Sequence, residues 1–484
     1  MKYNILTEKW IPMSDGQKYA LLECLEHAHE LERISCSSPL ETYALHRFLC
    51  AFVMDALQLP NKAARMALLK QGRFEMSIFE SYIKMCEEEG VSFDLFDAKR
   101  PFMQAEYNPQ FDKDTKNVSC MLLNVPSGTN HIFFEHKHED EHRLTIDDAF
   151  RSMLALFAFC PAGGAGYSKS VNGEPCLYAV VLGDSLFDTL LNNIISIKEA
   201  GNLPYGLPCW RDMTTRIPKE EIASIELLQG LTWQPRRVNL ISTPDGLVEK
   251  IFFTTGRKTP SSPLWRDPHV PYQKKDGAYF PILPKKGRSL WRDLGGMTLS
   301  KEDRFGRQPQ VIAALQSNSS IYKIAVTGLI TNGNAKLIDV MYEEAVLPYK
   351  VLNVMEYGEE FRHALQFVED IYTIILNESV KKKLIIKKGT KRTIKTIVTD
   401  AINEFFATTK DYLLGTYLKA LIVCDSDEEF VQQRVLLEQW LRKELTNTID
   451  QLLLRLGIDG HNLQRISEFK ENVLHNFNKK LRSF

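Results

Sequence analysis

The spacing of hydrophobic and polar residues changes near residue 355. Before that point, short apolar segments of mixed period are separated by turn residues, whereas after residue 357 apolar residues recur with helical spacing. Four such segments follow one another, over residues 361–375, 397–421, 431–453 and 463–477. Successive amphipathic segments are typical of a helix bundle. The pattern predicts an α+β protein in which a large mixed domain, residues 1–355, precedes a C-terminal four-helix bundle, residues 356–484.

Within the mixed domain, the period of the apolar residues distinguishes helices from strands. Apolar residues at helical spacing predict helices over 39–57, 63–69, 78–86, 146–159 and 185–196. Runs bounded by proline, glycine or asparagine predict strands over 3–12, 177–181, 232–240, 248–255, 321–330 and 337–346. Trp233 is expected to pack in the core.

Two dipeptides predict hairpin turns. Asp276-Gly277 follows two lysines and precedes aromatic residues, and Asn332-Gly333 separates two of the expected strands. A further basic turn lies at residues 285–288. From spacing alone, each of these turns is an ordinary hairpin tip or surface loop.

Composition indicates a multidomain globular protein. The 484 residues are 44% hydrophobic and 25% charged, enough for two or three cores. The nine cysteines form no C-x-x-C pair, and the N-terminus does not have the form of a signal peptide. No apolar run approaches the roughly 18 residues of a membrane span. We expect a reduced, cytoplasmic protein that does not contact a membrane.

Charge is distributed unevenly, although the net charge is only -1. Residues 1–150 contain 16 basic and 24 acidic side chains, whereas residues 251–310 contain 12 basic and 5 acidic ones. A basic surface on a nearly neutral chain suits a polyanion held within a larger assembly. A solvated basic loop region explains the charge equally well.

A glycine-rich stretch at residues 160–173, Cys-Pro-Ala-Gly-Gly-Ala-Gly-Tyr-Ser-Lys-Ser-Val-Asn-Gly, stands out. A backbone nearly without side chains can turn sharply, hold a phosphate or lie against another polymer. The stretch lacks the spacing of a P-loop, so nucleotide binding is disfavoured. A plain loop remains the simplest interpretation of the stretch by itself.

Four histidines among acidic residues suggest a metal site between residues 131 and 142, at His131, His136, His138 and His142. Zinc accepts such ligands, and a metal-dependent hydrolase would follow. The dense charge and flanking turn residues instead favour a solvated loop. No Ser/His/Asp order, HExxH motif or Walker pair occurs, so we expect a protein without catalytic activity, metal or cofactor.

Short blocks through the first 350 residues resemble, in order, the CasA family, the large subunit of the type I-E CRISPR effector complex Cascade. The blocks are Leu-Thr-Glu-Lys-Trp-Ile-Pro (6–12), Arg-Pro-Phe-Met-Gln (100–104), Ser-Gly-Thr-Asn (127–130), the glycine stretch, Gly-Leu-Thr-Trp-Gln-Pro (230–235) and Pro-Leu-Trp-Arg-Asp-Pro-His-Val-Pro (263–271). The resemblance implies a subunit that reads the protospacer-adjacent motif of double-stranded DNA from the minor groove. It also implies that the subunit starts strand separation for R-loop formation. The implied partners are target DNA, CRISPR RNA, other Cascade subunits and the helicase-nuclease.

The resemblance also assigns roles to residues. The family's glycine loop falls on Gly163, Gly164, Ala165 and Gly166, and its groove-inserting lysine on Lys274 or Lys275, of which we prefer Lys275. Its strand-separating wedge falls on Asn332, Gly333 and Asn334, with asparagine at 334 where the family has glutamine. Ser127, Gly128, Thr129 and Asn130 match a segment close to the guide RNA and the motif.

Other basic residues are candidates for contacts with the DNA backbone. The stretch 381–392 is rich in lysine, and no acidic residue lies between 380 and 399. This stretch could follow a phosphate backbone or simply be a solvated connection between helices. The candidate residues are Lys169, Lys387, Lys388, Lys391 and Arg392.

Overall fold

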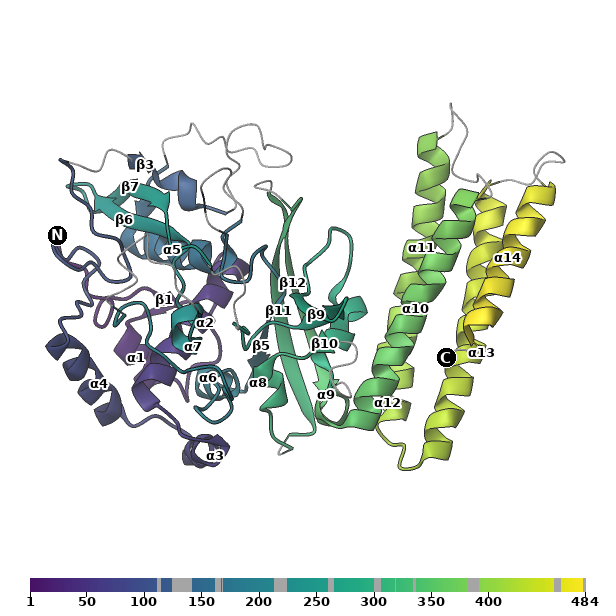
Figure 1. Cartoon of the computed structure of the whole chain (residues 1–484), viewed down its shortest axis with the longest axis horizontal. Helices are drawn as coiled ribbons and strands as arrows, with labels where there is room; N and C mark the ends of the chain where they lie inside the picture. Colours follow the sequence, from purple (N-terminus) through teal and green to yellow (C-terminus); the bar gives the residue numbers. More distant parts are fainter. Residues whose placement is uncertain are drawn as a thin grey trace. The chain divides into compact units, whose positions relative to one another are not determined.

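The computed structural model in Figure 1 describes most of the chain. The described residues are 1–110, 115–123, 142–161, 167, 169–212, 224–259, 265–299, 306–317, 319–333, 337–381, 391–456 and 463–481. Contacts divide the chain into two compact units, Met1–Arg288 with Phe305–Leu347, and Ser289–Arg304 with Pro348–Phe484. The predicted division after residue 355 placed 289–304 and 348–355 with the mixed domain, whereas both segments belong to the second unit.

Two buried helices form the centre of the first unit. Helix α2, Pro39–Leu57, begins where the hydroxyl of Ser38 accepts a hydrogen bond from the amide of Leu40, with proline at the first helical position. It packs against α5, Ile146–Phe159, in which nearly every residue is buried. These two helices confirm the helical pattern predicted for 39–57 and 146–159.

Shorter helices surround this pair. They are α1 Leu21–Glu26, α3 Lys62–Gln71, α4 Met76–Glu88, η1 Val118–Met121, α6 Leu186–Asn192, α7 Leu227–Leu231 and α8 Gln310–Ala313. The helices predicted over 63–69, 78–86 and 185–196 correspond to α3, α4 and α6.

The described strands form four small sheets. A four-stranded antiparallel sheet contains β3 Thr115–Asn117, β4 Leu144–Thr145, β6 Arg236–Ser242 and β7 Leu247–Thr255. Strand β7 is central, with β6 on one side and β3 and β4 on the other. A two-stranded sheet contains β1 Ile11–Pro12 and β2 Lys18–Tyr19.

Two three-stranded sheets carry the candidate site. One has the order β12-β11-β5, with β5 Tyr178–Leu182, β11 Ile321–Thr331 and β12 Leu337–Pro348. The other has the order β10-β8-β9, with β8 Tyr272–Lys275, β9 Ala278–Pro281 and β10 Gly306–Arg307. Apart from Pro348 at the end of β12, these strands belong to the first unit.

The strand predicted over residues 3–12 is wrong for most of its length. The side chain of Asn4 accepts a hydrogen bond from the amide of Leu6, and its carbonyl accepts one from the amide of Glu8 at 2.8 Å. Local bonds of this kind compete with a sheet ladder. The chain therefore turns, and within residues 3–12 the pairing consists of β1 at Ile11–Pro12 and an isolated antiparallel bridge between Asn4 and Asp94.

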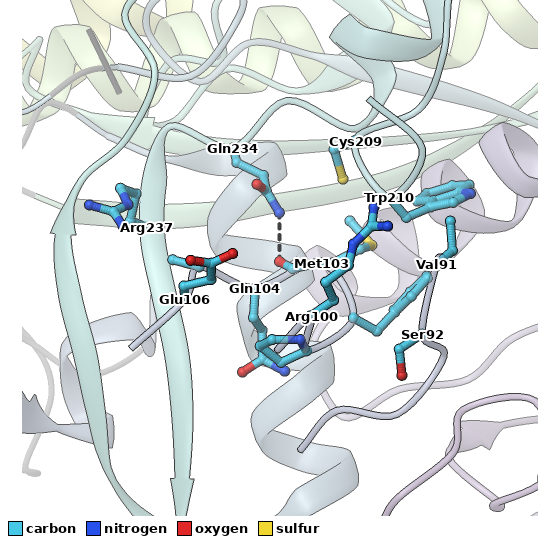
Figure 2. Close-up of a pocket in the computed structure, with 13 residues that line it drawn as sticks. Val91, Ser92, Arg100, Met103, Gln104, Glu106, Cys209, Trp210, Gln234 and Arg237 are labelled. Atoms are coloured by element: carbon cyan, nitrogen blue, oxygen red, sulfur yellow. Dashed lines mark hydrogen bonds between the residues drawn. The ribbon is translucent and has the colours of Figure 1, made fainter. Parts of the chain in front are cut away.

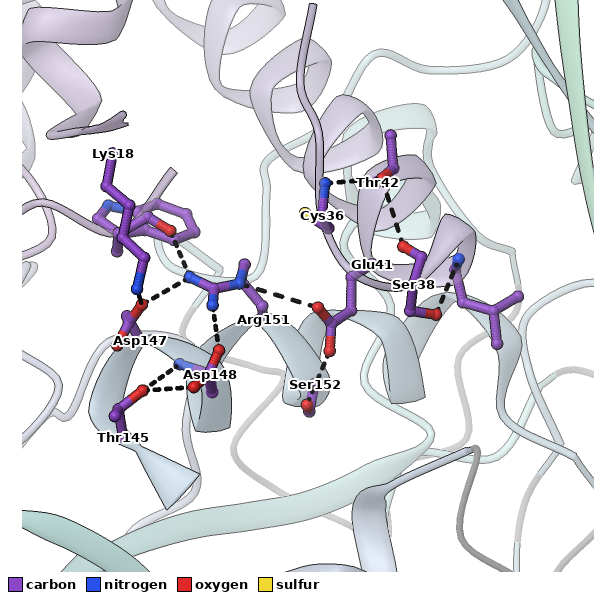
Figure 3. A network of polar contacts seen from close by, with 12 residues as sticks. Lys18, Cys36, Ser38, Glu41, Thr42, Thr145, Asp147, Asp148, Arg151 and Ser152 are labelled. Carbon is purple, nitrogen blue, oxygen red and sulfur yellow. Dashed lines mark hydrogen bonds and ion pairs between the residues drawn. The ribbon is translucent and has the colours of Figure 1, made fainter. Parts of the chain in front are cut away.

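A polar network ties this N-terminal segment to α5 (Figure 3). Arg151 donates to the carbonyl of Trp10 at 2.6 Å and to Asp147 at 2.8 Å. Asp147 also accepts from Lys18 at 2.5 Å, while Glu41 from α2 lies 3.8 Å from Arg151. Burial alone would raise the pKa of Asp147, but hydrogen bonds from Lys18 and Arg151 lower it to about 2.

The second unit is helical in the residues that the structure describes. Four long helices, which lie side by side in Figure 1, confirm the four predicted segments: α10 Met355–Lys381, α11 Lys391–Tyr412, α13 Asp427–Leu456 and α14 Leu463–Leu481. The short elements are η4 Leu290–Met297, α9 Tyr349–Asn353, the π-helical turn η6 Leu413–Tyr417 and α12 Leu418–Leu421. Lys391 and Arg392 begin helix α11, whereas the sequence pattern placed them in the connection before it. Among the described helices, none is long and apolar enough to span a membrane.

Candidate nucleic-acid interface

The hairpin formed by β8 and β9 presents both candidate lysines. Asp276 and Gly277 have φ values of 51° and 79°, so both residues of the two-residue turn are left-handed. This is the backbone that an Asp-Gly hairpin turn requires, and it confirms the predicted hairpin. The register pairs Lys274 with Tyr279 and Lys275 with Ala278. The two lysines are therefore the last strand residues before a tight turn.

The two faces of this hairpin differ. Lys274 and Tyr279 share a face, with the Lys274 Nζ 5.6 Å from the ring centroid and the Arg307 guanidinium 3.8 Å from the same centroid. Tyr272 lies on this face and is buried. Because side chains alternate along a strand, Lys275 lies on the opposite face, with Gln273 and the half-exposed Phe280.

A buried residue, Asp267, holds the base of the hairpin. The amide of Asp267 donates to the hydroxyl of Tyr272 at 2.9 Å, and its Oδ2 accepts from Arg47 at 2.7 Å and from Asn172 at 2.8 Å. Burial would raise the pKa of Asp267, but the guanidinium of Arg47 and the neighbouring His269 hold it well below its usual range. Asp267 thus joins the hairpin to α2 and to the end of the glycine stretch.

The two ends of the glycine stretch are bonded to each other. The amide of Ser170 donates to the carbonyl of Cys160 at 3.1 Å. Arg236, at the start of β6, donates to the carbonyl of Pro161 at 3.2 Å, and its guanidinium lies 4.9 Å from the Tyr167 ring centroid. The stem of the loop is therefore fixed on the first unit.

Lys169 at the end of this stretch is paired within the protein. Its Nζ lies 2.6 Å from Oε1 of Glu174, and Oε2 of Glu174 accepts from the hydroxyl of Thr331 at 3.4 Å. Thr331 ends β11 and accepts in turn from the amide of Gly333 at 3.2 Å. One carboxylate therefore connects the end of the glycine stretch to the Asn332-Gly333 hairpin tip.

Several predicted site residues lie outside the described part of the chain. These are Ser127, Gly128, Thr129, Asn130, Gly163, Gly164, Ala165, Gly166, Asn334, Lys387 and Lys388, together with the side chains of Lys391 and Arg392. The roles expected for them stay predictions. Of the four clustered histidines, only His142 is described.

Two pockets in the described residues, one beside β6 and one beside α4, do not resemble a hydrolytic site. The pocket in Figure 2, beside β6, has a volume of about 50 Å³, and the side chain of Gln234 is bonded across it to the carbonyl of Met103 at 2.5 Å. Substrate pockets are usually several hundred Å³. A wider hollow of about 800 Å³ beside α4 is lined by one carboxylate, Asp55, which is paired with Arg211 and Tyr82. No group of three histidine, cysteine or acidic side chains suited to a metal occurs among the residues described.

Comparison with solved structures identifies the fold. The chain is similar over 99% of its length to the crystal structure of CasA from Thermus thermophilus, covering 100% of that chain with a TM-score of 0.75 and 20% identity. It is similar over 98% of its length to a chain of a CRISPR RNA-guided surveillance complex, covering 99% of that chain with a TM-score of 0.76 and 17% identity. This is the fold of a CRISPR-associated protein.

The family follows from sequence. The model of the family described as CRISPR-associated protein Cse1 matches residues 4–456, and the chain belongs to this family. It is 27% identical over 394 residues to the CRISPR-associated protein CasA/Cse1 of Thermus thermophilus, covering 76% of each chain. The resemblance inferred from the short sequence blocks is confirmed.

Sequence reasoning missed the residues that hold the site together. Arg47, Asn172 and Asp267 meet although 220 and 95 residues separate Asp267 from its two partners. Asp267 lies in the Trp-Arg-Asp-Pro-His block, and Asn172 in the glycine stretch. The available sequence signal was the presence of a polar residue, Asp267 or Asn172, within each of these two blocks.

Proposed function

We propose that this protein is the large, non-catalytic subunit of a CRISPR RNA-guided surveillance complex. It reads the protospacer-adjacent motif of double-stranded DNA from the minor groove and starts strand separation. Two observations support its place in such a complex: it belongs to the Cse1 family, and its fold is similar to that of a chain of a surveillance complex. CRISPR RNA, other Cascade subunits and the helicase-nuclease are the partners in this proposal.

The observation that carries the proposal is the β8–β9 hairpin. A minor groove is about 6 Å wide, too narrow for a two-stranded ribbon, so a hairpin can offer it only the side chains near its tip. Lys275 is the last residue of β8, lies on the exposed face and forms no side-chain ion pair among the described residues. Its ammonium can donate to the N3 and O2 acceptors that line the groove.

The anchoring of the hairpin supports the same role. A base-reading side chain must be held on a rigid element, because free movement costs conformational entropy on binding. The left-handed turn, the ladder to β9 and β10 and the buried Asp267 fix the backbone of Lys274 and Lys275. Minor-groove acceptors differ little between A·T and T·A, so recognition should tolerate several motifs.

Three of the buried thiols are poorly suited to act as a nucleophile. Burial raises the pKa of Cys24, Cys50 and Cys160 to about 12, so these thiols remain protonated at neutral pH.

In this proposal, the binding energy of the protein for DNA drives strand separation. Opening one base-pair step costs roughly 1.4 kcal/mol of stacking, which a few inserted side chains can offset.

The test is a double variant, Lys274→Ala with Lys275→Ala, assembled with guide RNA and partner subunits. We expect it to lose binding to double-stranded target carrying the motif and to keep binding to single-stranded target, which pairs with the guide without motif reading. Equal loss on both substrates would contradict a motif-reading role.

A further inference from the structure

We infer that Glu174 is a positioning residue that sets the end of the glycine stretch, at Lys169, and the Asn332-Gly333 tip relative to each other for motif discrimination. This inference rests on the proposed function, in which both segments approach the same duplex. It assigns no direct DNA contact to Glu174. The carboxylate acts through the two segments that it joins.

The geometry is a continuous chain of polar contacts. The Nζ of Lys169 lies 2.6 Å from Oε1 of Glu174, and the hydroxyl of Thr331 lies 3.4 Å from Oε2. The same hydroxyl accepts from the amide of Gly333 at 3.2 Å. Because each carboxylate oxygen serves a different segment, a shift of either segment breaks a bond.

A tight backbone turn brings the two charged residues close together. The amide of Gly173 donates to the carbonyl of Ser170 at 3.0 Å, and the hydroxyl of Ser170 donates to the carbonyl of Gly173 at 3.1 Å. Gly173 has a φ of 84°, a conformation that favours glycine. This tight turn brings Lys169 and Glu174, five positions apart, onto the same side.

The ion pair between Lys169 and Glu174 also affects how strongly Lys169 can bind phosphate. The side chain of Glu174 is 16% exposed and that of Lys169 is 47% exposed, so the carboxylate is shielded while the ammonium faces solvent. Lys169 neutralises Glu174 and is thereby a weaker phosphate ligand than a free lysine. The ion pair therefore weakens the sequence-independent contact of Lys169 with the DNA backbone. Weaker non-specific binding increases the preference for DNA that carries the motif.

The main experiment uses Glu174→Gln in the complete complex with guide RNA. Affinities are measured over a salt series for a duplex with the motif, the same duplex with the motif scrambled, and single-stranded target. Glutamine keeps an oxygen for Thr331 but removes the charge that holds Lys169. We expect the preference for the motif duplex over the scrambled duplex to fall roughly 3-fold, the size of an exposed ion pair. The salt dependence for duplex should steepen by about one phosphate contact.

A second variant, Thr331→Val, tests the contact between Glu174 and the hairpin tip without changing the charge of Glu174. It removes the hydroxyl between Glu174 and Gly333 while Lys169 stays paired. It should also reduce motif preference roughly 3-fold, without a change in salt dependence. An unchanged preference in both variants, with thermal unfolding as in the wild type, would overturn the inference.

The matched control is Glu344→Gln. Glu344 forms an ion pair with Lys323 of β11 at 2.5 Å, on the same sheet, and also lies 3.5 Å from Arg33. Lys323 precedes Thr331 by eight residues along the strand, a distance of roughly 26 Å. This variant should leave motif preference unchanged, and an equal loss here would show that any disturbed ion pair of this sheet has the effect.

The double lysine variant distinguishes the two proposals. If Lys274→Ala with Lys275→Ala keeps full binding to motif duplex, the proposed function fails. If that variant loses binding while Glu174→Gln and Thr331→Val retain motif preference, the proposed function stands and the positioning role of Glu174 is wrong.

Discussion

The ammonium of Lys274 lies over the ring of Tyr279, 5.6 Å from its centroid, while the neighbouring Lys275 points to the opposite face of the hairpin. The guanidinium of Arg307 lies 3.8 Å from the same ring centroid. Contacts between a cation and an aromatic face contribute roughly 0.5 to 2 kcal/mol. The two adjacent lysines, equivalent by sequence, are therefore unequal in the fold, and this supports the preference for Lys275 as the groove-inserting residue.

Single substitutions should show this difference. Lys275→Ala should weaken binding of motif duplex roughly tenfold, because a charged donor to a base acceptor contributes about 1.5 kcal/mol or more. Lys274→Ala should weaken it by less than about 3-fold. Both variants are compared in the assembled complex by titration with labelled duplex at fixed salt. A larger effect of Lys274→Ala would reverse the assignment.

Phe280 should add apolar contact beside Lys275. It is 48% exposed, it pairs in register with Gln273, and it lies on the exposed face of the hairpin. Proteins that bind the minor groove often place apolar side chains against or between base steps. Phe280→Ala should therefore weaken motif duplex binding roughly fivefold, about 1 kcal/mol, and Phe280→Leu should weaken it less.

The control for this loss is Ile321→Ala, which truncates a 54% exposed apolar side chain at the beginning of β11. It should leave duplex binding unchanged. A loss as large as that of Phe280→Ala would mean that exposed apolar surface in general, and not the hairpin face, contributes to binding.

Asp267 should contribute strongly to stability. Asp267→Asn leaves the buried guanidinium of Arg47 without its counter-charge, and breaking such a pair typically costs about 3 to 5 kcal/mol. Asp276→Asn, on the exposed turn of the same hairpin, should change stability by less than about 0.5 kcal/mol. Urea unfolding followed by circular dichroism measures both, and equal midpoints would show that the buried pair contributes no net stability.

The elements that sequence predicted well are those in which the signal is local. The stripe from Phe361 to Ile375 gave helix α10, and Asp276-Gly277 gave the hairpin turn, because period and φ preference act over a few residues. The strand predicted over 3–12 failed because the side chain of Asn4 bonds to the backbone and turns the chain.

Long-range contacts explain the other features of the structure that the sequence did not predict. Arg292 in η4 forms a two-point ion pair with Glu369 in α10, which helps to place 289–304 with the second unit. Nothing in the period of residues 289–304 indicates this partner. The meeting of Lys169, Glu174 and Thr331 likewise depends on the pairing of β5 with β11, which periodicity does not specify.

His46 should make the stability of the chain depend on pH between 6.5 and 4. Burial, together with a smaller effect of the nearby His269, lowers the pKa of His46 to about 4. An unfolded histidine titrates near 6.5, so between these values the unfolded chain binds the extra proton. Stability is therefore fully present above about pH 6.5 and falls as the pH drops toward 4, by up to about 3 kcal/mol.

The variant His46→Leu removes this titration and fills the site with an apolar side chain. Urea unfolding of both proteins from pH 7 to pH 4 should show the wild type losing more stability than the variant, since every other group titrates in both. Parallel curves would mean that His46 gains its proton equally well in the folded protein.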